Sequence, residues 1–303
     1  MPRACGGLHG HARARPRRVF DGTLPQSKPT GSPGSLSDGK LAADNTRMRP
    51  CSSRIRLAFL IAIVMAGCAG DAPGAGAPIR VLFLGNSYTF VNDLPHMFAS
   101  LAASGGHAVV TTMDAAGGEL LQGHAGDPQA LALLDQGGWA FVVLQEQSQV
   151  PAVEPARSEV MFPAARALAA HARASGATPV FLMTWARQRG WPEARLDYPR
   201  MQTRISAAYC DIARELHTPV APVGQAWQQV RRSHPEIELW QPDGSHPTVA
   251  GTYLAACVLH ATLFHVSPEN LRYTAGLPST TVRLLQATAA QTVLAKPGLW
   301  QTP

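Results

Sequence analysis

Two short polar motifs in this chain contain the side-chain types of nucleophilic catalysis. Residues 85–88 read Gly-Asn-Ser-Tyr after an apolar run, and residues 243–247 read Asp-Gly-Ser-His-Pro before a helical pattern. A serine on a sharp turn between a strand and a helix can expose its hydroxyl while its backbone N–H points into the same cavity. An aspartate three residues before a histidine can orient the imidazole, whose other nitrogen takes the serine proton. The motifs therefore predict Ser87 as nucleophile, His246 as base and Asp243 as its orienting acid.

Each motif also has a structural interpretation. Asn86 or Ser87 can cap the helix that follows, and Asp243 or Ser245 can cap another helix that has Pro247 at its first position. Either motif alone is compatible with a capping role. Their occurrence together, at the ends of the first and last predicted strands, favours a catalytic pair.

Short apolar runs alternate with helical patterns from residue 79 onward. Strands are predicted at residues 79–84, 109–113, 140–144, 179–184 and 220–223, and helices at 92–104, 128–135, 154–174 (with a kink at Pro163), 201–216, 248–264 and 280–294. This alternation indicates βαβ units and a parallel sheet with helices on both faces. Active residues in such sheets gather in the loops at the carboxyl ends of the strands, where both motifs are predicted to lie.

Charge distribution and missing motifs exclude several classes of protein. The 303 residues carry a formal net charge of +6, but residues 1–67 hold 11 of the 26 basic residues and 3 of the 20 acidic ones. The remainder is slightly acidic and lacks the electrostatic footprint of a nucleic-acid-binding protein. The sequence also lacks nucleotide-binding glycine loops, the G-x-S-x-G elbow of α/β-hydrolases and Cys/His spacing typical of zinc sites. We therefore expect neither a metal nor an organic cofactor.

The N-terminal part differs in composition from the rest. Residues 1–47 are rich in Arg, Pro, Gly and Ser without apolar periodicity, so we expect a disordered extension, or a gene start placed upstream of the true start at Met48. Residues 48–67 combine basic residues with nine consecutive apolar ones, too few to span a bilayer, which takes about 20. This pattern is typical of a secretory signal peptide.

Cys68 directly follows Ala-Gly at the end of that signal. The arrangement resembles the lipobox of bacterial lipoproteins, in which the cysteine thiol is lipidated; the alternative is an ordinary signal peptide followed by a chance cysteine. Residues 68–78 are small and predict a flexible tether, which leaves residues 79–303 as the folded domain. Within that domain Cys210 and Cys257 either form a disulfide or remain buried free thiols.

From about residue 79 to 263 the chain resembles the SGNH, or GDSL-type, hydrolase superfamily. Gly-Asn-Ser at residues 85–87 matches the first block, which is usually Gly-Asp-Ser, and residues 243–246 match the last block, Asp-x-x-His. The resemblance implies a three-layer α/β/α fold with a flavodoxin-like parallel sheet of about five strands. It also implies a triad of Ser87, His246 and Asp243, with the backbone N–H of Ser87 in the oxyanion hole.

The resemblance also supplies candidates for the rest of the oxyanion hole. The second block is a glycine after the second strand, for which Gly118 is the best match and Gly117 a near rival. The third block, Gly-x-Asn-Asp in the family, is replaced here by Gln-Glu-Gln-Ser at residues 145–148, as in a little-characterised bacterial subgroup. Gln147 aligns with the asparagine, and Gln145 is the rival donor. Losing one such donor costs about 2.7–4 kcal/mol, so the departure bears directly on activity.

Further aromatic and basic residues follow the predicted strands. Trp185 and Arg187 come after the fourth strand and are placed to contact a sugar or an acid, although Trp185 fits a core position equally well. Tyr88 and Phe90 can wall an acyl pocket or simply pack.

The expected function is that of an exported, lipid-anchored serine esterase. It would act through an acyl-enzyme on a small-molecule or glycan ester, with a small acyl group such as acetyl on carbohydrate. The same triad also serves an acyltransferase, and a protein of another class, a non-catalytic glycan-binding surface lipoprotein, would keep the same fold. A membrane contact is expected through the lipid anchor alone. By analogy with the lipoproteins that the lipobox resembles, Ala69 after Cys68 favours the outer membrane in a two-membrane bacterium.

Overall fold

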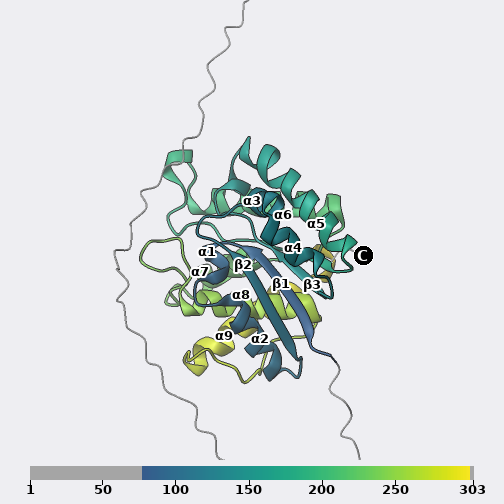
Figure 1. Cartoon of the computed structure of the whole chain (residues 1–303). Helices are drawn as coiled ribbons and strands as arrows, with labels where there is room; N and C mark the ends of the chain where they lie inside the picture. The colour runs from purple at the N-terminus through teal and green to yellow at the C-terminus, as the bar shows by residue number, and fades with distance from the viewer. Residues whose placement is uncertain (1–76, 301–303) are drawn as a thin grey trace, which may run out of the picture. The chain divides into compact units, whose positions relative to one another are not determined.

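The computed structural model describes residues 77–300, which are built around a five-stranded parallel sheet (Figure 1). The strands are β1 (Ile79–Gly85), β2 (Val109–Ala115), β3 (Phe141–Leu144), β4 (Thr178–Leu182) and β5 (Val220–Ala221). Their order in the sheet is β2-β1-β3-β4-β5, which is that of flavodoxin-like folds. Leu84 near the end of β1 pairs with Asp114 on one side and Leu144 on the other, so three strands end at the same edge.

Helices cover both faces of the sheet and complete three layers. They are α1 (Ser87–Phe90), α2 (Leu94–Ser104), α3 (Leu121–Gly126), α4 (Pro128–Asp135), α5 (Phe162–Ala174), α6 (Tyr198–Leu216), α7 (Val223–Ser233), α8 (Val249–Phe264), α9 (Ser279–Leu294) and α10 (Pro297–Trp300). Helices α4, α5 and α6 lie on one side of the sheet, and α2, α8 and α9 lie on the other (Figure 1). The predicted three-layer α/β/α fold is therefore confirmed.

Helix α8 is buried along almost its whole length, between the sheet and helices α2 and α9. Its sequence is apolar on all sides, which is typical of a fully buried helix. The hydroxyl of Thr248 caps it by accepting the N–H of Gly251 at 3.2 Å. Glycine is required there because a Cβ atom would lie 2.6 Å from the ring of Trp227. His246 lies three residues before this helix, so the backbone that carries it is connected directly to a tightly packed element.

The structure differs from the expected elements at several places. Helices α1, α3, α7 and α10 were not expected, and β5 is shorter than the predicted strand over residues 220–223. The buried residues of α7 are spaced as on one helix face, so its sequence did contain the signal. The helix expected over residues 154–174 is present as a π-helical turn at Arg157–Met161 that continues without a break into α5. The irregular turn directly precedes Pro163, where the sequence predicted a kink.

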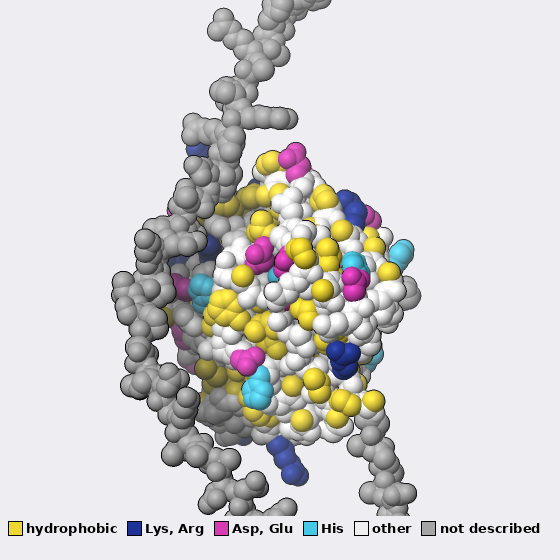
Figure 2. Space-filling model, in the orientation of Figure 1, with side chains coloured by type: hydrophobic (Ala, Val, Ile, Leu, Met, Phe, Trp, Pro, Cys, Tyr) yellow, Lys and Arg dark blue, Asp and Glu magenta, His cyan; other side chains and the backbone are white. Residues whose placement is uncertain are grey.

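Several expectations fall on the two cysteines or on the N-terminal part. Cys210 and Cys257 are both free thiols, so no disulfide joins them. The expectations for residues 1–47 and 48–67, for Cys68 and for most of the tether lie outside the described residues. Among residues 77–300, no helix is both long and apolar enough to cross a membrane. On the face seen in Figure 2, basic and acidic side chains are interspersed rather than gathered by sign.

Candidate active site

Ser87 stands at the first position of α1, directly after the end of β1. The side chain of Asn86 caps this short helix by accepting the N–H of Tyr88 at 3.1 Å. Gly85 permits the sharp turn, because a Cβ there would lie 2.4 Å from the Thr89 hydroxyl and 2.7 Å from Gln145 Oε1. No group in the described part of the chain accepts the backbone N–H of Ser87. The serine therefore presents both a hydroxyl and a free N–H at the sheet edge.

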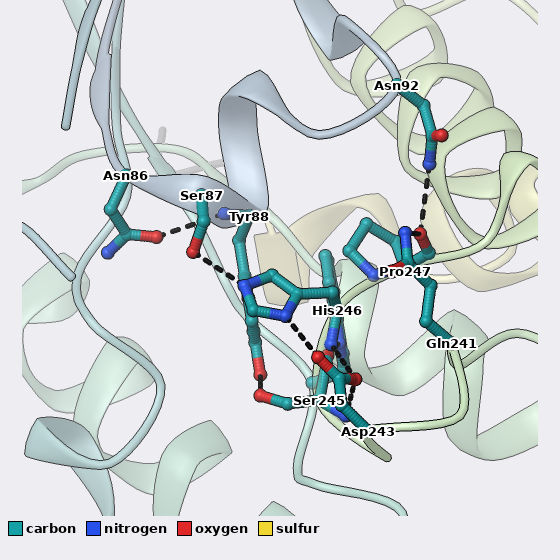
Figure 3. Close-up of polar contacts among 10 residues, drawn as sticks. Asn86, Ser87, Tyr88, Asn92, Gln241, Asp243, Ser245, His246 and Pro247 are labelled. Carbon is teal, nitrogen blue, oxygen red and sulfur yellow. Dashed lines mark hydrogen bonds and ion pairs between the residues drawn. The ribbon is translucent and has the colours of Figure 1, made fainter. Parts of the chain in front are cut away.

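His246 and Asp243 reach Ser87 from the other end of the chain (Figure 3). His246 Nε2 lies 2.9 Å from Ser87 Oγ, and His246 Nδ1 makes a short hydrogen bond with Asp243 Oδ2. Asp243 Oδ1 also accepts the backbone N–H groups of Ser245 at 2.8 Å and of His246 at 3.0 Å. Gly244 turns the chain between them with φ +67°. The structure thus brings the three predicted residues into one bonded series.

The charge of Asp243 is stabilised by these bonds. Partial burial alone would raise the pKa of this carboxyl, but the hydrogen bonds from His246 and Ser245 hold it below its usual value. An ionised carboxylate at Nδ1 fixes the tautomer that leaves Nε2 free to accept a proton. The arrangement can therefore draw a proton from the Ser87 hydroxyl.

Two side chains outside the motifs fix the position of the histidine loop (Figure 3). Asn92 Nδ2 donates to the carbonyl oxygen of Pro247 at 2.9 Å and to Thr252 Oγ1 at 3.0 Å. Gln241 Nε2 donates to the same carbonyl at 3.0 Å. Sequence reasoning missed both residues, because neither belongs to a recognisable motif.

A stack of aromatic rings joins the serine turn to the histidine loop. Tyr88 stacks on Trp185 with ring centroids 4.4 Å apart, and Trp185 stacks on Trp227 at 4.1 Å. Tyr88 Oη and Ser245 Oγ lie 2.8 Å apart, and Trp185 Nε1 donates to the Ser245 carbonyl at 3.0 Å. Burial raises the pKa of Tyr88, which keeps this phenol neutral. Trp185 is fully buried, so it occupies a core position rather than a sugar-contacting one.

Gln145 does not face the oxyanion position. Its Oε1 accepts the N–H of Asn86 at 3.0 Å and the hydroxyl of Thr89 at 2.8 Å. Its Nε2 donates to Asn86 Oδ1 at 3.0 Å and to the carbonyl of Glu146 at 2.7 Å. Because both amide hydrogens already have buried acceptors, the expectation of Gln145 as a rival oxyanion donor is wrong. Gln145 instead locks the serine turn to the end of β3.

The same network accounts for asparagine at position 86. Asn86 Oδ1 accepts bonds from Tyr88 and Gln145, while Asn86 Nδ2 donates to the Glu119 carbonyl at 2.8 Å. An aspartate would lack that donor. Asn86 therefore holds the serine turn to the loop that follows β2, which carries Gly118.

Gly118 lies in that loop with φ +74°, a conformation that side-chain-bearing residues rarely adopt. Its N–H has no acceptor among residues 77–300, and the N–H of Gly117 has none either. Both N–H groups are therefore available to a bound molecule. Asn86 ties this loop to the serine turn through the carbonyl of Glu119, the residue that follows Gly118.

Gln147 bonds within its own loop. Its Oε1 accepts the N–H groups of Gln149 at 2.7 Å and Val150 at 3.4 Å, and its Nε2 donates to Gln149 Oε1 at 3.3 Å. One of its two amide hydrogens is left for a ligand. The adjacent Glu146 is fully buried, and burial raises its pKa to about 7. Glu146 Oε1 accepts the N–H of Gln147 at 2.7 Å and that of Leu121 at 3.3 Å, which joins this loop to the start of α3.

The two glutamines are expected to respond differently to truncation. Gln145→Ala leaves several buried polar groups without partners, each worth about 1–3 kcal/mol, so urea unfolding should show a clear loss of stability. Gln147→Ala should unfold almost as wild type, but should lower kcat about 10²- to 10³-fold with little change in KM if it meets the oxyanion. Steady-state kinetics on an aryl acetate distinguishes the two. Wild-type kcat in Gln147→Ala would mean that the oxyanion has two donors.

No three His, Cys, Asp or Glu side chains within residues 77–300 lie close enough together to hold a metal ion.

Solved structures resemble this chain over much of its length. A candidate SGNH hydrolase from Slackia heliotrinireducens is 31% identical, and the match covers 61% of this chain and 99% of that one with a TM-score of 0.54. A DUF4886 family protein from Bacteroides uniformis is 19% identical over 73% of this chain and 96% of that one, with a TM-score of 0.64. No family model and no curated protein matches the chain. The DUF4886 family protein is therefore similar to this chain in fold alone, whereas the protein from Slackia heliotrinireducens is similar in both fold and sequence.

Proposed function

Because this chain belongs to the SGNH hydrolases, we propose that it is a serine esterase that acts through an acyl-enzyme. The observation that carries this proposal is the bonded series from Ser87 through His246 to Asp243. The free N–H groups of Ser87 and Gly118 add to its support. In this role Ser87 is the nucleophile, His246 the general base and Asp243 the group that orients it.

The proposed reaction has two symmetric halves. Ser87 Oγ attacks the ester carbonyl while His246 Nε2 takes its proton, and the N–H groups of Ser87 and Gly118 stabilise the oxyanion, with the Gln147 carboxamide as third donor. His246 then gives the proton to the departing alkoxide, and the alcohol leaves behind an acyl-serine. Water attacks this ester in the same way, which releases the acid and restores the serine.

We propose a small acyl group, such as acetyl on a carbohydrate, as the part transferred to Ser87. The same acyl-enzyme serves an acyltransferase when a sugar hydroxyl takes the place of water. The two reactions differ in their product. Mass spectrometry after incubation with an acetylated sugar and a free acceptor sugar distinguishes hydrolysis from transfer.

Labelling by a fluorophosphonate probe tests the esterase most directly. We expect the purified protein to be labelled on Ser87 and to hydrolyse aryl acetates, because His246 activates that hydroxyl. Ser87→Ala is the control and should show no labelling while its circular dichroism remains that of wild type. A folded wild-type protein that is neither labelled nor active would instead favour the alternative, a glycan-binding protein.

We also propose that the protein is exported and anchored by a lipid on Cys68. The supporting feature is the sequence from Met48 to Cys68, with its basic start, short apolar run and small residues before the cysteine. Wild-type protein should partition into the detergent phase of a membrane extract, and Cys68→Ser should accumulate as an unprocessed precursor. Recovery of wild type in the aqueous phase would contradict the anchor.

A further inference from the structure

Glu146 is a buried carboxyl group that has no role in the proposed chemistry. It follows β3 in the Gln-Glu-Gln-Ser segment and is fully buried. Its Oε2 is buried without a hydrogen-bond partner among residues 77–300. A buried polar atom without a partner is costly, so an apolar side chain of the same volume would be less costly for stability at this position. The bonds of the other carboxyl oxygen, Oε1, supply a reason for the glutamate.

Glu146 Oε1 accepts backbone N–H groups from two different loops. The N–H of Gln147 donates to it at 2.7 Å, and the N–H of Leu121 donates to it at 3.3 Å. Leu121 is the first residue of α3 and is fully buried in the core. Glu146 therefore ties the loop after β3, which carries Gln147, to the start of α3.

The start of α3 is in turn held to the serine turn. His124 lies on α3 and is buried, and its Nε2 donates to the Gly85 carbonyl at 2.8 Å, two residues before Ser87. Because a carbonyl oxygen only accepts, the ring hydrogen of His124 is on Nε2. Helix α3 therefore has a fixed position relative to the nucleophile, and Glu146 fixes the loop that carries Gln147 to that helix.

The bonds that Gln147 makes with its own side chain have a different effect. Its Oε1 accepts the N–H groups of Gln149 and Val150, and its Nε2 donates to Gln149 Oε1. These bonds fix the carboxamide within its loop, but all of their partners belong to that loop. The position of the carboxamide relative to Ser87 therefore depends on bonds that leave the loop, and the Glu146 side chain makes such a bond.

We infer that Glu146 is a positioning residue of the oxyanion hole, which holds the Gln147 carboxamide at the distance from Ser87 that the transition state requires. The inference rests on the proposed esterase function and on Gln147 as its third oxyanion donor. A donor displaced by about 1 Å loses much of its effect on the oxyanion. Because that charge exists only in the transition state, the loss falls on kcat rather than on KM.

Three substitutions of Glu146 separate its acceptor oxygen from its volume and reach. Glu146→Gln keeps an acceptor of the same reach and should retain most of the wild-type kcat. Glu146→Met fills the same space without an acceptor, and Glu146→Asp shortens the reach by one methylene group. Both should lower kcat for an aryl acetate about 10- to 100-fold with little change in KM. Wild-type kcat in Glu146→Met, or in Glu146→Asp should the Met variant not fold, would overturn the inference, and so would a Gln variant as slow as the Met variant.

Gln286→Ala is the matched control for the loss of a buried polar side chain. Gln286 is buried on α9, where its Oε1 accepts the N–H of Asn270 at 3.1 Å and its Nε2 donates to the Leu271 carbonyl at 2.9 Å. Its removal should lower stability in urea, as Glu146→Met does, but should leave kcat at the wild-type value. An equal loss of kcat in the two variants would show that the loss follows from instability, and would overturn the positioning role.

A double variant shows whether Glu146 acts through Gln147. Gln147→Ala already lacks the carboxamide, so the addition of Glu146→Met should lower kcat no further. Two independent structural effects would multiply instead, which would refute the inference. Wild-type kcat in Gln147→Ala would also refute it and leave the esterase standing with two donors. A folded wild-type protein that hydrolyses no ester would refute the esterase, and the positioning role with it.

Discussion

Ser87→Ala and His246→Ala are each expected to lower kcat for ester hydrolysis by about 10⁴- to 10⁶-fold. The reason is the 2.9 Å contact between Ser87 Oγ and His246 Nε2, through which each group depends on the other. Alanine at 87 removes the nucleophile, and alanine at 246 leaves the hydroxyl without a base. The double variant should be no slower than either single variant, because the two residues act as a unit. The measurement is kcat and KM on an aryl acetate.

A second histidine–aspartate pair in the protein provides a matched control. His171 Nε2 lies 2.6 Å from Asp135 Oδ1, and the pair joins helices α5 and α4 rather than loops at the strand ends. His171→Ala should keep wild-type kinetics. If His246→Ala were as active as His171→Ala, the assignment of His246 as general base would fail.

Asp243→Asn is expected to lower kcat about 10⁴-fold while the protein stays folded. In wild type the carboxylate accepts from His246 Nδ1, so that Nε2 faces Ser87 without a hydrogen. An asparagine amide pointing at Nδ1 donates instead of accepting, which moves the imidazole hydrogen to Nε2. His246 then has no lone pair for the serine proton. Kinetics on an aryl acetate and urea unfolding measure the two effects separately.

Two further substitutions show whether the tautomer is the cause. Asn at 243 still offers an oxygen to the N–H groups of Ser245 and His246, so the turn should persist, whereas Asp243→Ala loses those bonds as well. We therefore expect both variants to be inactive but only Asp243→Ala to be less stable. Asp135→Asn, in the other pair, should remain fully active. Substantial activity in Asp243→Asn would show that Asp243 does not set the tautomer.

Local patterns in the sequence were sufficient to predict the fold class and the position of the triad residues. Asp243 and His246 are three residues apart, so a single turn brings them together. Ser87 is 159 residues away from His246, yet its place after the first strand predicted that it lies at the same sheet edge. The alternation of apolar runs and helical patterns predicted the parallel sheet, because burial on both faces leaves a continuous apolar strand. These features are encoded by neighbouring residues.

The roles of the polar side chains around the triad could be assigned only from the tertiary structure. Asn86 and Gln145 are 59 residues apart, and their bonds exist because β1 and β3 are neighbours in the sheet. A carboxamide carries no signal of whether it meets a bound molecule or a backbone group, so the sequence left Gln145 and Gln147 as rivals. The structure excludes Gln145 as an oxyanion donor, because both of its amide hydrogens already have buried acceptors.

The sequence alone therefore determined which residues form the candidate triad and on which kind of sheet they stand. Only the tertiary structure decided what holds them, namely the ring stack through Trp185 and the bond from Asn92 to the histidine loop. The physical reason is the distance along the chain over which the interactions act. Helices, strands and tight turns follow from the periodicity and conformational preferences of adjacent residues, whereas packing and hydrogen-bond partners depend on which distant segments the fold places side by side.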